Sequence, residues 1–387
     1  MVAVQIMSKP YIRPRVALVA LHFAEYATHL AMALAEKMDV LLVLYRDNAQ
    51  SELGSNWTDR IKHSSLTLLV MERPRSVFLI IRNTRRLVSA IKEFRPDVIH
   101  YQENPRDELI LGLLLLSAIP TILTIHDPSP HSGVDTRRLR FSRFRLYRPL
   151  FRNAADIAIT HGNLLANELV KVCPRFKGRV HAVPHGPLGS RVSSEATTRC
   201  AGEIRLLFFG RIHEYKGLRY FIDSVIILRN KGYPVIGVVA GRGSDLEPNR
   251  QRMEEEGCFE ILERYISSEE IPNLFLDSCV VILPYIDGTQ SGVAAMALAY
   301  ARPVVASRVG SIPELVRHNE NGLLVPPCDA MALAEAIEHV ITDNELWERL
   351  AMGARMLRNG ELSWNSIADT TIRIYNSVVE MRSGLYR

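Results

Sequence analysis

Two cations follow a predicted strand, at a place where they could bind phosphate. Arg211 and Lys216 stand five residues apart just after the apolar run 204–209, and Gly210 separates that run from the first cation. A glycine at a strand end lets the backbone turn close to a ligand, and two cations beyond a sheet edge can converge on one doubly charged group. A diphosphate is the natural candidate, although an ordinary solvent-exposed loop would have the same spacing.

A second loop has the residues of an anion site. Residues 284–294 follow another apolar run and lead into a helix predicted over 295–300. Unpaired backbone N–H groups and the helix dipole favour an anion at such a helix start. The N–H groups of Ser291, Gly292 and Val293 would then hold a phosphate. The alternative is a plain N-cap, in which the Ser291 side chain or its neighbour Thr289 only closes the helix.

Both loops belong to a regular alternation of strands and helices. Short β-branched runs alternate with longer amphipathic stretches, which is typical of parallel sheets covered by helices. Because ligands bind at the carboxyl ends of strands in such sheets, the residues after each strand are the candidate site. The fold class expected is α/β with two doubly wound, Rossmann-like domains that face each other. The predicted strands are 16–20, 40–45, 66–70, 98–101, 121–125, 157–160 and 180–183, then 204–209, 235–240, 259–262, 280–284, 303–307 and 322–325.

The strand pattern also predicts the domain boundaries. The polar stretch 191–202 contains no strand and is predicted to link a first domain over 1–190 to a second over 203–362. An amphipathic stretch within 363–387 is predicted to form a terminal helix, which could pack on either domain.

Composition places the chain among ordinary globular proteins. Of 387 residues, 47% are apolar and 23% charged, which suits two or three domains. Five scattered cysteines have neither CxxC nor histidine spacing, so no disulfide framework or zinc site is expected. The N-terminus has no secretory signal, and a reducing cytoplasm fits best. The long apolar run 109–125 is divided by Pro120, so we expect a buried helix over 109–118 and a strand, not a membrane span.

Positive charge is concentrated in the first half of the chain. Residues 1–190 hold 26 Lys and Arg against 16 Asp and Glu, so this half attracts anions. The densest run, over 137–152, alternates arginines with large apolar residues, as in a segment that lies on an anionic lipid surface. A solvated basic surface and a nucleic-acid site are the two alternatives, of which nucleic acid is the least favoured. The arginines of the run are Arg137, Arg138, Arg140, Arg143, Arg145, Arg148 and Arg152.

The second half of the chain resembles a known family. The motifs FFGRIHEYKG (208–217), VAGRG (239–243), YISSEEIP (265–272), AYARPVVAS (299–307) and GSIPELV (310–316) occur in order. Together they resemble the donor domain of glycosyltransferase family 4, a family of retaining enzymes with the GT-B fold. The resemblance implies that the terminal helix crosses back to the first domain.

The resemblance also implies roles for individual residues. Arg211 and Lys216 match the pair that neutralises the departing nucleotide diphosphate, and residues 291–293 match the loop that holds the distal phosphate. Tyr265 and Ile266 match the strand edge that reads the base through main-chain groups. The donor implied is a UDP- or GDP-sugar, with no cofactor and no metal, since cations and helix termini stabilise the leaving group. The same predicted donor site contains Gly210, Asp287 and Gln290.

One family feature is missing from this segment. Most members carry two glutamates eight positions apart, the first for the donor sugar and the second for the ribose. Here those positions are Gly288 and Met296, neither of which has a carboxylate. Asp287 stands one residue early and could replace the first glutamate. The sequence around Gln290 resembles a subset of the family that departs in the same way.

The first half resembles the family's acceptor domain more loosely. His126 and Asp127 follow the strand 121–125 and match a histidine loop near the reacting sugar, where an imidazole can orient the donor sugar or an acceptor hydroxyl. A histidine that merely caps the loop is the alternative. His22 follows the first strand and is a weaker acceptor-side candidate. His161 and His185 also follow strands, and His185 is expected to be mainly structural.

These observations predict a retaining glycosyltransferase that moves a sugar from a nucleotide-diphosphate donor to an acceptor hydroxyl. A carbohydrate or lipid-linked acceptor in cell-surface polysaccharide or glycolipid assembly is expected, with the protein in the cytoplasm or on the cytoplasmic membrane face. The alternatives are a catalytically silent partner that binds nucleotide sugar or lipid, favoured by the missing glutamates, and a nucleotide-sugar epimerase.

Overall fold

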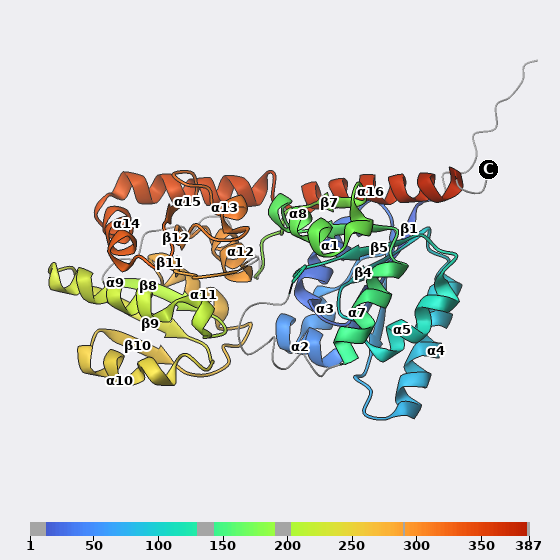
Figure 1. Ribbon diagram of the computed structural model, residues 1–387, viewed down its shortest axis with the longest axis horizontal. Coiled ribbons are helices and arrows are strands. Elements are labelled where there is room, and N and C mark those ends of the chain that lie inside the picture. Colours follow the sequence, from blue (N-terminus) through green and yellow to red (C-terminus); the bar gives the residue numbers. More distant parts are fainter. Residues whose placement is uncertain (1–12, 130–142, 190–202, 289–290, 385–387) are drawn as a thin grey trace, which may run out of the picture.

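The computed structural model describes residues 13–129, 143–189, 203–288 and 291–384. It has two lobes, each built on a sheet whose paired strands are all parallel (Figure 1). The first sheet has seven strands in the order β3-β2-β1-β4-β5-β6-β7, and the second has six in the order β10-β9-β8-β11-β12-β13. The predicted α/β class is confirmed, and every predicted strand lies within one residue of an observed one.

In the first sheet the strands are β1 Arg15–Ala20, β2 Asp39–Tyr45, β3 Leu66–Met71, β4 Val98–Gln102, β5 Thr121–Thr124, β6 Ile157–Thr160 and β7 Val180–Ala182. In the second they are β8 Ile204–Phe209, β9 Val235–Ala240, β10 Phe259–Leu262, β11 Val280–Leu283, β12 Val304–Ser307 and β13 Gly322–Val325.

Helices cover both faces of the first sheet. Along β1, Val16 and Leu18 point to one core while Ala17 and Val19 point to the other, as the two-residue period of a strand requires. The sheet is therefore buried on both sides, which explains its continuous apolar runs. The helices of this lobe are α1 Ala24–Ala35, α2 Arg46–Leu53, α3 Trp57–Arg60, α4 Val77–Phe94, α5 Asp107–Leu113, α7 Arg143–Ala154 and α8 Asn163–Val172, with short 3-10 turns η1 Leu114–Leu116 and η2 Pro174–Phe176.

The second sheet is covered in the same way. Leu206 and Phe208 of β8 face one core and Leu207 faces the other. Its loops at the carboxyl ends of β8 and β11 carry the predicted donor site. The helices of this lobe are η3 Glu214–Lys216, α9 Leu218–Asn230, α10 Glu247–Glu256, α11 Ile271–Leu276, α12 Gly292–Ala299, α13 Ile312–Leu315, α14 Ala330–Thr342 and α15 Asn344–Asn359.

The last helix, α16 (Trp364–Gly384), leaves the second lobe and lies along the first (Figure 1). Its apolar residues Ile367 and Val378 belong to the same buried core as α1. At its far end the Arg382 guanidinium pairs with Asp156, with nitrogen to oxygen distances of 2.9 and 3.1 Å. The helix thereby ties the two lobes together.

The apolar stretch 109–118 differs from its prediction as a buried helix. The α-helix ends at Leu113, and Leu111, Leu114 and Leu115 are exposed, Leu114 by 84%. Only one face of this stretch packs inward, against α4, so every third or fourth side chain is buried and the others reach the surface. In the described part of the chain no helix is long and apolar enough to cross a membrane.

Candidate functional site

The two predicted phosphate loops lie against each other in the second lobe. The loop after β8 turns through Gly210, whose φ is +104°, and ends at Gly217, whose φ is +69°. A Cβ atom on Gly217 would lie 2.0 Å from the Pro284 carbonyl oxygen, so only glycine allows this approach. The close contact brings the Lys216 loop to the start of the loop after β11.

A hydrogen-bonded chain links the two loops. The Lys216 Nζ donates to the Tyr285 hydroxyl at 2.8 Å, and the Tyr285 and Ser291 hydroxyl oxygens are 3.2 Å apart. Ser291 is the N-cap of α12, and its Oγ accepts from the Ala294 N–H at 3.2 Å. If Tyr285 donates to Ser291, the serine's own proton remains available to a ligand. Sequence reasoning gave Tyr285 no role, although its place just after β11 was the available signal.

The site carries positive charge that no carboxylate of the described residues pairs with. In the described residues neither Arg211 nor Lys216 forms an ion pair. Burial, assisted by Arg211, lowers the pKa of Lys216 to about 8. Burial also raises the pKa of Tyr285 to about 12, so that residue stays a neutral donor. A buried ammonium beside a second cation destabilises the folded protein when no anion is bound, and a bound anion compensates this charge.

The other residues predicted for the donor site differ in their exposure and contacts. Gly210 lies close to both Lys216 and Val293, because a Cβ there would be 3.5 Å from each side chain. Gly292 is exposed at the start of α12. Asp287 is also exposed, and its Oδ1 accepts from the neighbouring Gly288 N–H at 2.8 Å. Gln290 lies outside the described residues.

The predicted base-reading segment also contacts the first lobe. The Tyr265 side chain is 62% exposed, and its hydroxyl donates to the Ser51 carbonyl oxygen of α2 at 2.8 Å. Nearby, the Ser55 N–H donates to the Glu269 carboxylate at 3.4 Å. Ile266 is buried beside them. This segment therefore bridges the lobes, a contact that sequence analysis did not predict.

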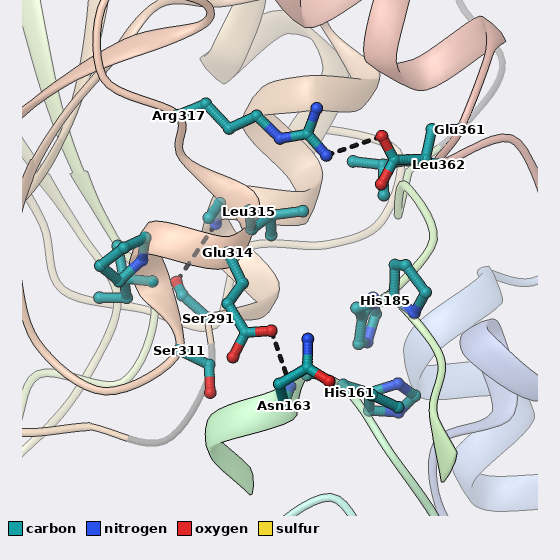
Figure 2. Close-up of a pocket in the computed structure, with 16 residues that line it drawn as sticks. His161, Asn163, His185, Ser291, Ser311, Glu314, Leu315, Arg317, Glu361 and Leu362 are labelled. Atoms are coloured by element: carbon teal, nitrogen blue, oxygen red, sulfur yellow. Dashed lines mark hydrogen bonds and ion pairs between the residues drawn. The ribbon is translucent and has the colours of Figure 1, made fainter. Parts of the chain in front are cut away.

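A second bridge between the lobes forms at α8. The N–H groups of Asn163 and Leu164 donate to the Glu314 carboxylate at 2.7 and 3.0 Å, so a residue of the second lobe caps a helix of the first (Figure 2). Negative charge at a helix N-terminus is stabilising. Sequence analysis gave Glu314 no role.

A cavity of about 310 Å³ lies beside this second bridge. Figure 2 shows that its wall combines residues of the two lobes, with Glu314 and Ser291 on one side and the imidazoles of the first lobe on the other. Its polar lining includes His161, His185, Ser291, Ser311, Glu314 and Arg317. Because Ser291 belongs to both the phosphate loop and this wall, the cavity adjoins the predicted donor site.

The His126 ring lies inside a packed cluster of aromatic rings. It stacks on Phe23 with centroids 3.7 Å apart, and its Nε2 is 2.8 Å from the Gln102 Oε1. Burial and the neighbouring histidines lower its pKa, so the imidazole is neutral at pH 7. Asp127, next in the chain, is half-buried. The packing leaves the ring little open surface, because Phe23 covers one face.

His22 lies nearer the donor loops than its place in the first lobe suggests. Its side chain is half exposed, with the Nδ1 at 3.4 Å from the Asn48 amide nitrogen. Desolvation lowers its pKa to about 4, with contributions from Arg106 and from Arg211 of the opposite lobe. His22 and Arg211 are thus electrostatic neighbours across the gap between the lobes.

The arginine run 137–152 is not a continuous exposed face. Arg152 is buried and pairs with Glu103 at 2.6 Å, and Arg148 pairs with the same carboxylate at 3.3 Å. These two guanidiniums hold α7 to the sheet, which corrects their prediction as surface cations. The side chains of Arg137, Arg138, Arg140, Arg143 and Arg145 lie outside the described part of the structure.

The exposed apolar side chains of the first lobe gather on three helices. Eight of the fourteen large apolar residues that are exposed in the described part belong to α4, α5 with η1, and α7, which pack side by side (Figure 1). We call this set the apolar patch. Its members are Val77, Phe78, Ile81, Leu111, Leu114, Leu115, Leu146 and Leu150.

Comparison with known proteins gives consistent matches. The family model described as Glycosyltransferase Family 4 matches residues 24–186, and the model described as Glycosyl transferases group 1 matches residues 203–343. Alpha-D-kanosaminyltransferase of Streptomyces kanamyceticus is 29% identical over 179 residues, covering 45% of each chain. Glycogen synthase of Mycobacterium tuberculosis is 23% identical over 288 residues, covering 73% of this chain and 69% of that protein. In the first of these matches the chain spans about half the length of the relative.

Solved structures share the fold across nearly the whole chain. HepE of Anabaena, crystallised with UDP and glucose, has a TM-score of 0.67 at 16% identity and covers 94% of this chain and 100% of its own. Sucrose-phosphate synthase of Thermosynechococcus elongatus has a TM-score of 0.66 at 18% identity, covering 95% and 100%. These likenesses confirm the predicted GT-B architecture. With a glycosyltransferase family model on each lobe, two lobes built on parallel sheets and a cationic junction of loops in the second lobe, the protein is a family 4-like glycosyltransferase.

Proposed function

We propose that the protein is a retaining glycosyltransferase that moves a sugar from a nucleotide-diphosphate donor to an acceptor hydroxyl. The observation that carries the proposal is the junction of Arg211, Lys216, Tyr285 and Ser291. There, two cations that form no ion pair within the described part of the chain lie at a helix start. Retention of the anomeric configuration is what membership of the family implies.

The junction is suited to stabilising a leaving diphosphate. Negative charge grows on the phosphate oxygens as the bond to the sugar breaks, so preformed donors act most strongly in the transition state. Lys216 and Arg211 supply the positive charge. The Ser291 hydroxyl and the first N–H groups of α12 supply neutral donors. No metal ion is needed at the diphosphate for this mode of catalysis.

UDP- and GDP-sugars are the donors to test. HepE was crystallised with UDP-glucose as well as with UDP, which makes UDP the first choice. The chain departs from most of the family at Gly288 and Met296, so ribose and donor sugar must be held by other groups. Asp287 is the one carboxylate beside Gly288 in this loop.

A donor and acceptor screen followed by proton NMR tests the reaction. We expect release of nucleotide diphosphate together with a product that has the donor's anomeric configuration. Arg211→Ala and Lys216→Ala should each lower kcat about 100-fold or more, as loss of a transition-state donor does. Lys231→Ala, which removes a surface lysine paired with Glu338, is the matched control and should keep full activity. An inverted product, or unchanged kcat in both site variants, would contradict the proposal.

A catalytically silent nucleotide-sugar binder is the second candidate, and the two carboxylate-free positions Gly288 and Met296 favour it. Such a protein would bind the donor at the same junction. It would never release free nucleotide diphosphate, whichever acceptor was offered. Tight donor binding without turnover across an acceptor screen would select this function.

We further propose that the apolar patch rests on an anionic membrane where a lipid-linked acceptor is presented. Helical spacing places Arg82 four residues after Phe78 and Arg85 four residues after Ile81, so exposed cations stand beside exposed apolar groups. Apolar insertion combined with positive charge is how peripheral proteins bind anionic lipid. The proposed contact is through α4, α5, η1 and the exposed leucines of α7, and not through a continuous face of arginines.

Vesicle sedimentation tests the membrane contact. The double variant Phe78→Ser and Leu114→Ser should lose binding to vesicles that contain phosphatidylglycerol, because these side chains are 73% and 84% exposed. Met352→Ser alters an equally apolar, half-exposed residue of the second lobe and should bind normally. Equal sedimentation of all three proteins would remove the membrane proposal.

A further inference from the structure

Three histidines from neighbouring strands meet at one edge of the first sheet. His126 follows β5, His161 follows β6 and His185 follows β7, and these strands lie next to one another in the sheet. Each histidine offers one ring nitrogen, and these three atoms all lie within 4.8 Å of one another. We call these residues the histidine triad. Of all His, Cys, Asp and Glu side chains in the described chain, they alone form a group of metal-binding geometry.

Backbone oxygens fix which nitrogen of two imidazoles carries the proton. His161 Nδ1 lies 3.2 Å from the Val183 carbonyl oxygen, and His185 Nδ1 lies 2.7 Å from the Gly186 carbonyl oxygen. A carbonyl oxygen can only accept, so both Nδ1 atoms carry hydrogen and both Nε2 atoms keep a free lone pair. Histidines that bind metals have the same outer hydrogen bonds, which orient the ring and hold the tautomer.

One of those lone pairs has no partner among the residues that the structure describes. His161 is 95% buried, and its Nε2 forms no hydrogen bond with any of them. A buried polar atom without a partner is costly, and such atoms in native proteins commonly receive a water or an ion. His161 and His185 both line the cavity between the lobes, as Figure 2 shows, so a bound ion would have access to it.

The surroundings suit a cation. Asp127 acts electrostatically on His161, and Glu25 acts on His185. Two carboxylates therefore lie near enough to compensate a doubly charged ion without ligating it.

We propose that His126, His161 and His185 bind one divalent transition metal ion, Zn²⁺ or a metal of like preference, with the fourth position open to the cavity. Neutral imidazole suits Zn²⁺, Co²⁺ and Ni²⁺ and does not suit Mg²⁺ or Ca²⁺. Tetrahedral Zn–N bonds of about 2.1 Å set the ligand nitrogens about 3.4 Å apart, so each nitrogen must move inward by at most about 0.8 Å, a small side-chain rotation. Three protein ligands with an open fourth position leave room for a water or a substrate hydroxyl.

Metal uptake by the untagged full-length protein tests the proposal. After removal of metal with a chelator, the protein is titrated with Co²⁺ in the absence of any nucleotide or acceptor. We expect one Co²⁺ per chain with the intense visible bands of tetrahedral coordination, displaced by Zn²⁺. Because no donor is present, failure here says nothing about the proposed transferase function, and failure of that function says nothing about the metal.

Three variants show where the metal binds. His161→Gln should weaken Co²⁺ binding about 100-fold or more and abolish the visible bands. His181→Ala removes an exposed histidine of β7 outside the triad and should bind as the wild type does. His185→Gln, on another strand, repeats the test if His161→Gln loses its cooperative thermal transition. No Co²⁺ uptake by the wild type, or equal uptake by all variants, would overturn the proposal.

Discussion

Replacing Lys216 with methionine should stabilise the protein while removing its donor site. The ammonium is buried beside Arg211 and has no carboxylate partner in the described chain, so the folded state holds its proton less tightly than the unfolded chain does. A lowered lysine pKa means that the charged form costs stability at neutral pH, and that this cost fades as the pH rises through the interval between the folded and unfolded values.

The size of the effect follows from the pKa. The pKa of Lys216 is about 8 in the folded protein against 10.5 in the unfolded chain. The charged lysine therefore lowers the free energy of unfolding by about 3 kcal/mol at pH 7 and by about 1.5 kcal/mol at pH 9.5. Loss of the hydrogen bond to Tyr285 subtracts about 1 kcal/mol at either pH. Lys216→Met should therefore gain about 2 kcal/mol in unfolding free energy at pH 7 and much less at pH 9.5.

Urea denaturation of both proteins at pH 7 and pH 9.5 measures this difference. Lys231→Met is the control, because Glu338 raises the pKa of that exposed lysine, and its removal should bring no gain at neutral pH. A Lys216→Met protein less stable than the wild type at pH 7, or equally stabilised at pH 7 and pH 9.5, would show that the buried ammonium does not destabilise the fold.

Three further predictions concern contacts between segments. Tyr285→Phe removes the hydroxyl that links Lys216 to Ser291 and should raise the Kd of the bound nucleotide several-fold, a loss of about 1 kcal/mol of binding free energy. Calorimetry measures the Kd, and an unchanged value would contradict this role of Tyr285. Glu314→Gln removes the charge that caps α8 and should lower the free energy of unfolding, measured by urea denaturation, by about 1 to 2 kcal/mol. A substitution at a surface residue that caps no helix should leave this free energy unchanged. Arg382→Ala removes the ion pair at the end of α16 and should lower the free energy of unfolding by a similar amount. Arg382→Lys keeps the charge and should restore part of this loss.

The strands were predictable because a sheet buried on both faces leaves an uninterrupted apolar run in the sequence. The ends of β8 and β11 then located Lys216 and Ser291 correctly relative to the sheet. Such features depend on residues that are neighbours in the chain, which is why a single sequence reveals them.

Contacts between distant segments were not predictable in this way. Tyr285 links two loops because the backbone at Gly217 passes against Pro284, and no spacing in the sequence encodes that approach. Arg152 follows the alternation from which a surface position was predicted, yet its ion pair with Glu103 lies in the interior. Leu114 belongs to an apolar run but lies outside the core, because only one face of that run meets α4.

Thermal unfolding in the presence of UDP and of GDP shows whether Arg211 and Lys216 bind the donor nucleotide. A nucleotide at 100 times its Kd adds about 2.7 kcal/mol of stability, enough for a clear rise in Tm. We expect one of the two nucleotides to raise the Tm of the wild type and to leave the Tm of Arg211→Ala and of Lys216→Met unchanged. No shift with either nucleotide, or the same shift in both variants, would contradict the assignment of this junction as the donor site.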